Sequence, residues 1–148
     1  MNKEDSSIDK KVTNESSSNN NGSTSEKPPK PEDKPFELFI AEEFIPDLIQ
    51  ALTKLGSKPI QINLENGARP ITGDECWMVI GEIANSRRFW LCFDTNKITS
   101  RKTISIAEQG SSPSVLESFL IDEKRITKTL LISRLLQRLN GQKWLGAN

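Results

Sequence analysis

The chain has 148 residues, including 20 basic and 20 acidic side chains, two cysteines and no histidine. Its neutral charge balance lacks the basic excess typical of nucleic-acid-binding domains, so we expect no nucleic-acid partner. Without histidine it lacks the commonest general base and metal ligand, and two cysteines are too few for a zinc site of Cys and His alone. It has no apolar run of the ~18–20 residues that a membrane span needs, and its start does not resemble a signal peptide. These features predict a protein that is cytoplasmic, or peripheral on the cytosolic face of a membrane, without direct membrane insertion.

The first 34 residues differ in composition from the rest of the chain. They contain the run SSSNNNGSTS and most of the Pro-rich stretch KPPKPEDKP, and Met1, Ile8 and Val12 are their only sizeable apolar side chains. Such a segment cannot bury enough apolar surface to offset a chain-entropy cost of ~1–2 kcal/mol per residue. We therefore predict a disordered leader and tether over residues 1–34 and a single folded domain over residues 35–148.

Residues 36–55, FELFIAEEFIPDLIQALTKL, have helical periodicity. Their apolar side chains recur every three or four positions, as one face of an α-helix requires. Gly56 suits the position just past a helix end. Pro46 interrupts the pattern, because proline lacks an N–H and clashes with the carbonyl four residues earlier. We expect a kink there, or two helices that meet near Phe44 and Ile45.

The middle of the chain predicts strands. Apolar and polar residues alternate in residues 59–66, two apolar runs at residues 76–84 and 87–95 flank a short turn as in a β-hairpin, and residues 103–107 form a fourth run. With the helices, these runs predict an α+β fold. We expect an antiparallel sheet of about four strands, packed with an N-terminal and a C-terminal helix.

The register of the hairpin depends on the length of its turn. A two-residue turn at residues 85–86 places Trp90 across from Gly81. It also places Cys76 and Cys92 on opposite faces of the sheet, where they cannot form a disulfide. A three-residue turn shifts the pairing by one and places both cysteines on one face. In either register both faces carry large apolar groups, so one packs on the helices and the other lies under long loops or binds a partner.

Two more helices are predicted after the strands. Residues 114–121, SVLESFLI, contain Ser114 and Glu117 at the spacing of a capping box, which indicates a short helix. A terminal helix is predicted over roughly residues 123–139, with the acidic residues 122–123 complementing the positive end of its dipole.

The apolar stripe of the terminal helix has basic residues on its opposite face. We expect Gly141 to end this helix in the left-handed conformation, and Trp144 with Leu145 to fold back onto the last turn or the sheet. The predicted stripe consists of Leu131, Ile132, Leu135, Leu136 and Leu139. The end of the chain is therefore expected to be an anchored terminus whose basic side, Arg134, Arg138 and Lys143, stays available for binding.

No catalytic arrangement is recognisable in the sequence. A nucleophilic Ser or Cys needs a neighbouring base, and the carboxylate pairs at residues 74–75 and 122–123 are adjacent residues whose side chains point in different directions. Gly67 and Gly73 lack the strand, glycine-rich loop and helix of a phosphate site. We therefore predict a protein that is not an enzyme and binds no cofactor or metal. Redox chemistry at the cysteines and base stacking on the aromatic strands remain open alternatives.

Four segments taken together resemble a known family. They are KPPKPEDKPFELFI (27–40), GDECWMVIG (73–81), PSVLESFLIDEKRIT (113–127) and SRLLQRLNGQKWLGAN (133–148). This ordered set is similar to a family of small proteins of cyanobacteria and chloroplasts that is associated with the V subunit of the photosynthetic NAD(P)H dehydrogenase-like complex. The leader has no arginine and seven acidic residues, unlike a plastid transit peptide, which favours a cyanobacterial form.

The resemblance implies a peripheral, cofactor-free accessory subunit on the cytosolic face of the thylakoid membrane. Such a subunit stabilises the complex and supports ferredoxin-dependent cyclic electron flow around photosystem I. Subunits of that complex are the expected partners, and ferredoxin is a further candidate because a basic surface suits an acidic carrier. An assembly factor for a photosynthetic complex, or a free protein-binding module, is the alternative. The candidate interface residues are Trp77, Arg87, Arg88 and Trp90 on the hairpin and Arg134, Arg138 and Lys143 on the tail.

Overall fold

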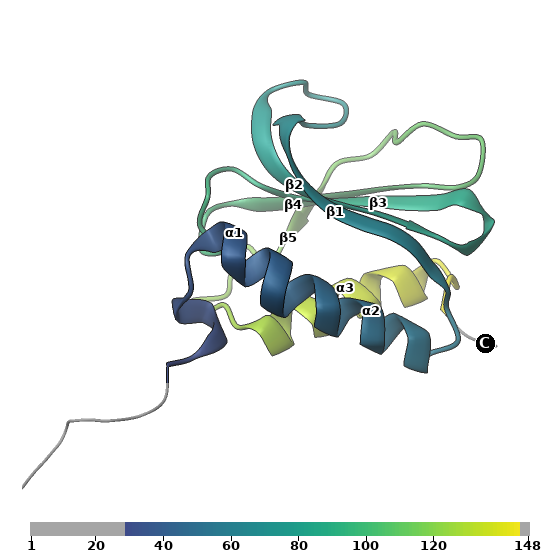
Figure 1. The fold of residues 1–148 in the computed structure, drawn as a ribbon. Coiled ribbons are helices and arrows are strands. Elements are labelled where there is room, and N and C mark those ends of the chain that lie inside the picture. The colour runs from purple at the N-terminus through teal and green to yellow at the C-terminus, as the bar shows by residue number, and fades with distance from the viewer. Residues whose placement is uncertain (1–28, 146–148) are drawn as a thin grey trace, which may run out of the picture. The chain divides into compact units, whose positions relative to one another are not determined.

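A five-stranded antiparallel sheet forms one layer, and helices cover one of its faces. The computed structural model describes residues 29–145, and the strands follow the order β1-β2-β3-β4-β5. Their bounds are β1 (Pro59–Ala68), β2 (Glu75–Ile83), β3 (Arg87–Phe93), β4 (Lys102–Ala107) and β5 (Glu117–Phe119). The helices α1 (Phe36–Leu38), α2 (Ile45–Lys54) and α3 (Lys128–Gly141) lie beneath the sheet in Figure 1. The predicted α+β class is confirmed, with five strands in place of about four.

The predicted leader covers residues 1–34, and its residues 1–28 lie outside the described part of the chain. Within the described residues, the compact unit begins at Pro31, before the predicted start at residue 35, and Pro31–Asp33 forms a 3-10 turn. This turn is tied to α3, because the backbone N–H of Lys128 donates a hydrogen bond to the carboxylate of Glu32 over 2.7 Å.

The N-terminal helical run contains a π-helical segment, Phe39–Phe44, between α1 and α2. The N–H of Ile45 donates to the carbonyl of Ile40, a step of five residues. The wider turn gives the ring of Pro46, in the first turn of α2, room beside the carbonyl that it would meet in a regular α-helix. The expected break near Phe44 and Ile45 is therefore present as a change of helix type.

The β2–β3 hairpin has a three-residue turn, Ala84–Ser86. Ile83 pairs with Arg87 and Gly81 with Phe89, so the register of the two-residue turn is wrong. Asn85 and Ser86 both have positive φ, and these left-handed conformations reverse the direction of the chain within the three-residue turn. Phe89 lies across from Gly81 where Trp90 was expected. Cys76 and Cys92 belong to one cluster on the same face of the sheet, as the three-residue turn predicts.

Residues 114–121 do not form a helix, which corrects the capping-box prediction. Residues Glu117–Phe119 form the edge strand β5. Phe119 is buried beside β4, and Leu120 has a φ of 54°, which an α-helix cannot contain. Glu117 binds Arg138 of α3 instead of capping a helix. Strand pairing and core burial therefore outweigh the local helix signal.

Helix α3 begins at Lys128, five residues later than predicted. The side chain of Thr127 caps it by accepting a hydrogen bond from the N–H of Leu130 over 3.1 Å. The acid near its positive end is the distant Glu32, and the residues 122–123 lie outside the helix. The end of α3 also differs from the prediction, because Lys143, and not Gly141, has the positive φ in the turn that follows.

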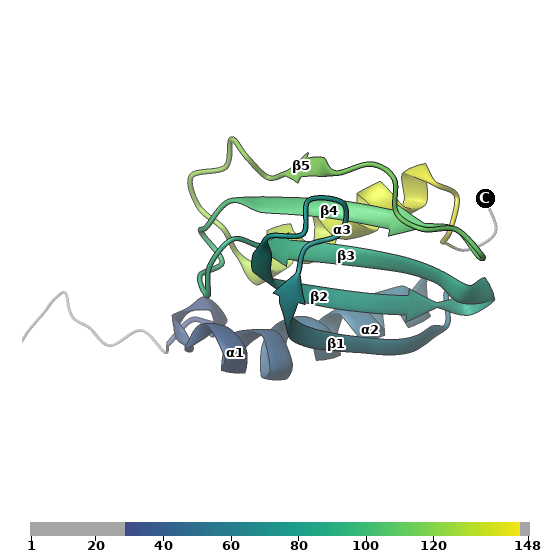
Figure 2. The same ribbon diagram turned by 90° about the horizontal axis from the view of Figure 1, so that it is seen from above.

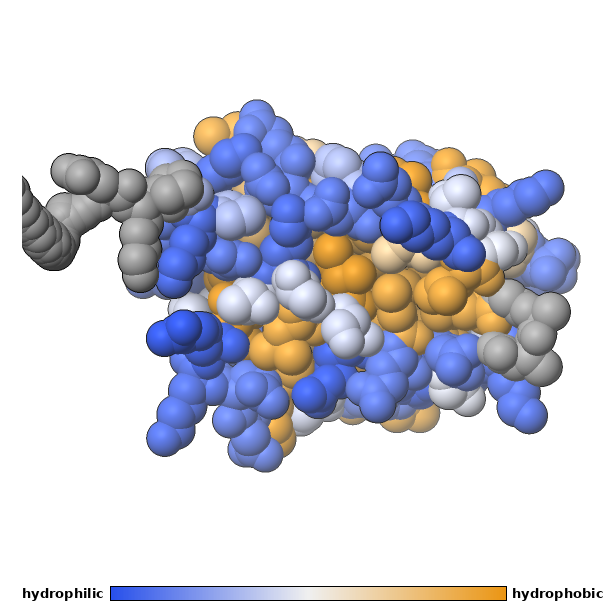
Figure 3. Space-filling view, turned by 90° about the horizontal axis from the view of Figure 1, so that it is seen from below, coloured by the Kyte–Doolittle hydropathy of each residue, from blue (hydrophilic) through white to orange (hydrophobic). Residues whose placement is uncertain are grey.

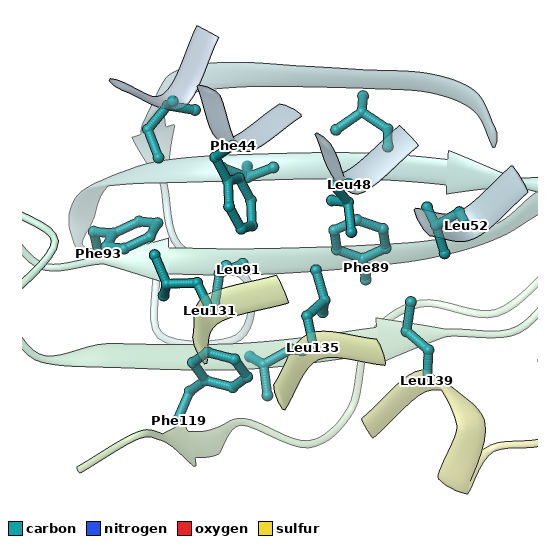
Figure 4. Close-up of a cluster of buried hydrophobic side chains, with 14 of the residues drawn as sticks. Phe44, Leu48, Leu52, Phe89, Leu91, Phe93, Phe119, Leu131, Leu135 and Leu139 are labelled. Atoms are coloured by element: carbon teal, nitrogen blue, oxygen red, sulfur yellow. The ribbon is translucent and has the colours of Figure 1, made fainter. Parts of the chain in front are cut away.

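The main core lies between the sheet and the helices. Figure 4 shows its side chains pointing inward from both layers. The labelled members are Phe44, Leu48 and Leu52 from the N-terminal helical run, Phe89, Leu91 and Phe93 from β3, Phe119 from β5, and Leu131, Leu135 and Leu139 from α3. Burying a leucine or phenylalanine side chain contributes about 1.5–3 kcal/mol, so this core positions both helices on the sheet.

Candidate functional site

A groove runs between α2 and α3 on the side of the molecule away from the sheet. It encloses about 870 Å³. The two helices run in the same direction in Figure 1, and Asp47 and Lys128, near their starts, form an ion pair across one end of the groove. Leu55 and Asn140, near the helix ends, also line the groove. Seen from below in Figure 3, apolar side chains form a strip between polar ones on this face. This groove is the main candidate surface for binding.

The apolar floor of the groove follows from the geometry of the two helices. Leu52 of α2 and Leu131 and Leu135 of α3 point into the core. Neighbouring residues are rotated by about 100° and therefore line the gap between the helices. These residues are Ala51 of α2, Leu55 directly after that helix, and Ile132 and Leu136 of α3; Leu145 also lines the groove. Leu55 is 45% exposed, so part of this apolar surface contacts water.

Ion pairs neutralise the end of the groove where both helices begin. The ammonium of Lys128 lies 2.7 Å from Asp47 and 3.1 Å from Glu43. Lys34 lies 2.7 Å from the other oxygen of Glu43 and 3.1 Å from Glu42. Hydrogen bonds to Asp47 and then to Glu43 raise the pKa of Lys128, and hydrogen bonds from Lys34 and Lys128 lower the pKa of Glu43. These charges are already satisfied within the chain.

The other end of the groove, where both helices end, carries exposed basic residues. Lys54 lines the groove, and Lys143 lies in the turn between the groove residues Asn140 and Leu145. Lys58 lies outside the groove lining, directly before β1. All three lysines are exposed, and within residues 29–145 none of them makes an ion pair. The groove is therefore neutralised at one end and basic at the other.

A loop covers part of the outer face of the sheet. The loop between β1 and β2 crosses above the strands (Figures 1 and 2). Arg69 in this loop is 3% exposed. Its guanidinium donates to Thr103 of β4 over 2.8 Å and also binds Asp74 and Asp94. Burial alone would lower the pKa of Arg69, but the hydrogen bonds to Asp94 and Asp74 outweigh this effect, and the pKa is raised. Arg69 therefore clamps the loop onto the sheet.

The two cysteines lie under this covered part of the outer face. Cys76, Met78 and Cys92 are all buried there. Burial raises the pKa of the Cys92 thiol to about 12 and also raises the pKa of Cys76. Because the thiolate is the reactive form, both thiols are poor nucleophiles at neutral pH. The cysteines act here as small apolar side chains of a secondary core.

The hairpin residues predicted to form an interface lie on different surfaces. Trp77 packs on the helix side, with its ring 5.8 Å from that of Phe36. Trp90 lies on the outer face, where the guanidinium of Arg88 stacks 5.1 Å from its ring. Arg87 lies 5.6 Å from the ring of Trp144. Arg88 and Trp90 are thus the hairpin pair that the structure brings together on the outer face.

The three tail residues that were predicted to form an interface also have different surroundings. Arg138 binds both carboxylate oxygens of Glu117, at 2.7 and 2.6 Å, and these bonds lower the pKa of Glu117. Arg134 lies 3.7 Å from Glu123. Lys143 is exposed in the turn after α3, between the groove residues Asn140 and Leu145. Residues that line the groove from α2, such as Leu55 and Lys54, were not in the predicted interface, because nothing in the sequence places α2 beside α3.

Within residues 29–145, no group of three or more His, Cys, Asp and Glu side chains is placed to hold a metal ion. In the same range, no helix is both long and apolar enough to cross a membrane.

Comparison with known proteins places the chain in a family. No curated protein matches the chain. A family model matches residues 30–146, a range that contains every helix and strand described above. The chain therefore belongs to the family described as "Protein of unknown function (DUF2996)".

Proposed function

We propose that the chain is a non-catalytic, peripheral accessory subunit of the photosynthetic NAD(P)H dehydrogenase-like complex. In this role it stabilises the complex and supports ferredoxin-dependent cyclic electron flow from the cytosolic face of the thylakoid membrane. The resemblance of the four sequence segments, which extend over residues 27–148, is the reason for naming this complex.

The apolar groove between α2 and α3 is the observation that carries a binding role. An accessory subunit needs a surface whose burial against a partner releases free energy. The groove offers apolar side chains from two helices, among them the half-exposed Leu55. Each 100 Å² of apolar surface removed from water contributes about 2.5 kcal/mol before the costs of association. A hollow apolar strip rimmed by polar groups is typical of protein-binding sites.

Charge supports the same proposal. Lys54 lines the groove, and Lys143 lies in the turn between the lining residues Asn140 and Leu145; both are exposed and have no acidic partner within the described residues. Unpaired surface cations favour encounter with acidic partners and set the orientation of docking. Subunits of the complex are the proposed partners, and ferredoxin is a further candidate on the same electrostatic grounds.

Deletion of the gene in a cyanobacterium tests the proposed function. We expect less of the assembled complex on native gels and slower dark re-reduction of the photosystem I reaction centre, because both depend on an intact complex. Expression of the full chain from a plasmid should restore both. Unchanged complex abundance together with unchanged re-reduction in the deletion strain would overturn the proposal.

A further inference from the structure

We propose that the groove between α2 and α3 receives an amphipathic helix of a partner protein, with acidic residues in the part that lies over Lys54 and Lys143. This inference rests on the proposed function, since it names the kind of segment through which the complex would hold the chain. It goes beyond that function in assigning a site, an occupant and an orientation.

The shape of the groove fits a helix. Helix α3 has 14 residues and so spans about 21 Å, the length of roughly four helical turns. The apolar side chains occur as two pairs with a spacing of four residues, Ala51 with Leu55 and Ile132 with Leu136. This spacing matches the i and i+4 ridges by which helices pack. A third helix laid between α2 and α3 would bury its apolar stripe on both pairs at once.

The rim of the groove also suits the polar flanks of such a helix. Its uncharged polar residues carry amide and hydroxyl groups that can hydrogen-bond to side chains beside an apolar stripe. They are Gln50 on α2 and Thr129, Ser133 and Gln137 on α3. All four are exposed or half-exposed along the groove, so a bound helix would meet polar groups at its edges and apolar groups at its centre.

The charges fix the orientation of the occupant. At the start of the helices, Lys128 is already paired with Asp47 and Glu43, so this end offers little net attraction. At the other end, Lys54 and Lys143 are exposed and have no ion-pair partner within the described residues. Acidic residues of the occupant therefore gain most when they lie over that end.

Helix dipoles favour the same orientation. Because α2 and α3 are parallel, their partly negative C-terminal ends lie together beside Lys54. An occupant antiparallel to both would place its positive N-terminal end there. Acidic side chains in the first turn of a helix stabilise that helix through its dipole. In this orientation the same side chains would also attract Lys54 and Lys143.

A second copy of this chain is the less suitable occupant. If two copies faced each other through the same groove, two concave surfaces would meet, and these are not complementary in shape. A two-fold arrangement with parallel grooves would also oppose the lysines of one copy to those of the other. A helix from a different protein meets neither difficulty.

Peptide binding to the full chain tests this inference. The probes are two synthetic fluorescent peptides of about 16 residues with the same Leu and Ala stripe, one with three Glu in its first turn and the other with three Lys. We expect fluorescence anisotropy to show about tenfold tighter binding of the Glu peptide at low salt. The double variant K54E/K143E should reverse this preference, whereas Lys97→Glu, at an exposed lysine in the β3–β4 loop, should leave it unchanged. Leu55→Gln should weaken both peptides, with melting temperatures close to wild type because Leu55 is 45% exposed.

Three results would overturn the inference: equal affinity for both peptides, a preference that survives K54E/K143E, or no effect of Leu55→Gln. Concentration-dependent dimerisation that Leu55→Gln abolishes would also overturn it and would make a second copy the occupant. These outcomes are separate from the proposed function. Loss of the complex in the deletion strain, fully restored by the K54E/K143E chain, would leave the function standing and refute the groove as its docking site.

Discussion

The indole Nε1 of Trp144 donates a hydrogen bond to the carboxylate of Glu108 over 2.7 Å. This bond joins the segment that follows α3 to the residue directly after β4. Trp144 is 5% exposed, and the guanidinium of Arg87 stacks on its ring. Trp144 is therefore anchored to the sheet, as expected from the sequence, and the next residue, Leu145, lines the groove.

Replacing Trp144 tests this anchor. Trp144→Ala should lower the free energy of unfolding by about 3–5 kcal/mol, because it removes a large buried side chain. Trp144→Phe keeps most of the packing and loses the hydrogen bond to Glu108, so a smaller loss of about 1–2 kcal/mol is expected. Denaturant titration measures both. A near-wild-type midpoint for the alanine variant would mean that Trp144 is exposed in solution.

The two arginines that bind Asp94 should differ in their effect on stability. Arg69 is buried and also binds Thr103, whereas the side chain of Arg101 is 69% exposed. Arg69→Ala takes from the buried hydroxyl of Thr103 its hydrogen bond to the guanidinium and releases the loop carboxylate of Asp74, and should cost about 1–3 kcal/mol. Arg101→Ala breaks an exposed ion pair and should cost at most about 1 kcal/mol. Equal effects in thermal melts would contradict the clamp that Arg69 forms over the outer face.

A substitution at Gly81 tests the register of the hairpin. A Cβ added there would lie 2.3 Å from the ring of Phe89, too close for the ring to stay in place. Gly81→Ala should therefore lower stability by about 1–3 kcal/mol. Combining it with Phe89→Leu should make the two effects less than additive, since the smaller side chain frees space. In the register of a two-residue turn, Trp90→Leu would show this coupling instead.

Acid should weaken the tie between β5 and α3. Hydrogen bonds from Arg138 lower the pKa of Glu117 below its ordinary value. A carboxyl with a lowered pKa in the folded state stabilises the protein fully above its unfolded pKa, about 4.3, and the contribution disappears as the pH falls through the folded pKa. Glu117→Gln should thus lower the melting temperature at pH 7, and the difference from wild type should shrink below pH 4.

Glu37 provides the control for this experiment. It is exposed, and within residues 29–145 it makes no ion pair. Glu37→Gln should leave the melting temperature at pH 7 close to that of the wild type. A constant difference between Glu117→Gln and wild type from pH 7 to pH 3 would show that the ion pair with Arg138 does not stabilise the fold.

Local sequence patterns correctly predicted the strands and helices in which apolar residues recur at a regular spacing. The alternation in β1 and the apolar runs of β2 and β3 come from the pleat of a strand, and the leucine stripe of α3 comes from the helical turn. The pattern was misleading where distant residues decide the structure. Glu117 has the spacing of a capping box, yet its partner is Arg138, and Phe119 is buried beside β4.

The candidate site was less predictable than the fold, because it depends on which helix faces lie beside each other. Lys54 and Leu55 are about 80 residues away from Ile132 and Leu136 in the chain, and the sequence gives no sign that they share a groove. The basic tail was recognised, but Arg138 is paired with Glu117, and Lys143 is the tail residue in the turn between the groove residues Asn140 and Leu145. Ion pairing, which follows from the tertiary structure, decides which basic residues are available.

Native-gel separation of solubilised thylakoid membranes from a cyanobacterium that expresses tagged full-length chain tests the central claim most directly. We expect the wild-type chain and Lys97→Glu to migrate with the NAD(P)H dehydrogenase-like complex, and K54E/K143E to migrate as a small free protein although its melting temperature is unchanged. A wild-type chain that migrates only at its own size, while the complex on the same gel is intact, would contradict the account.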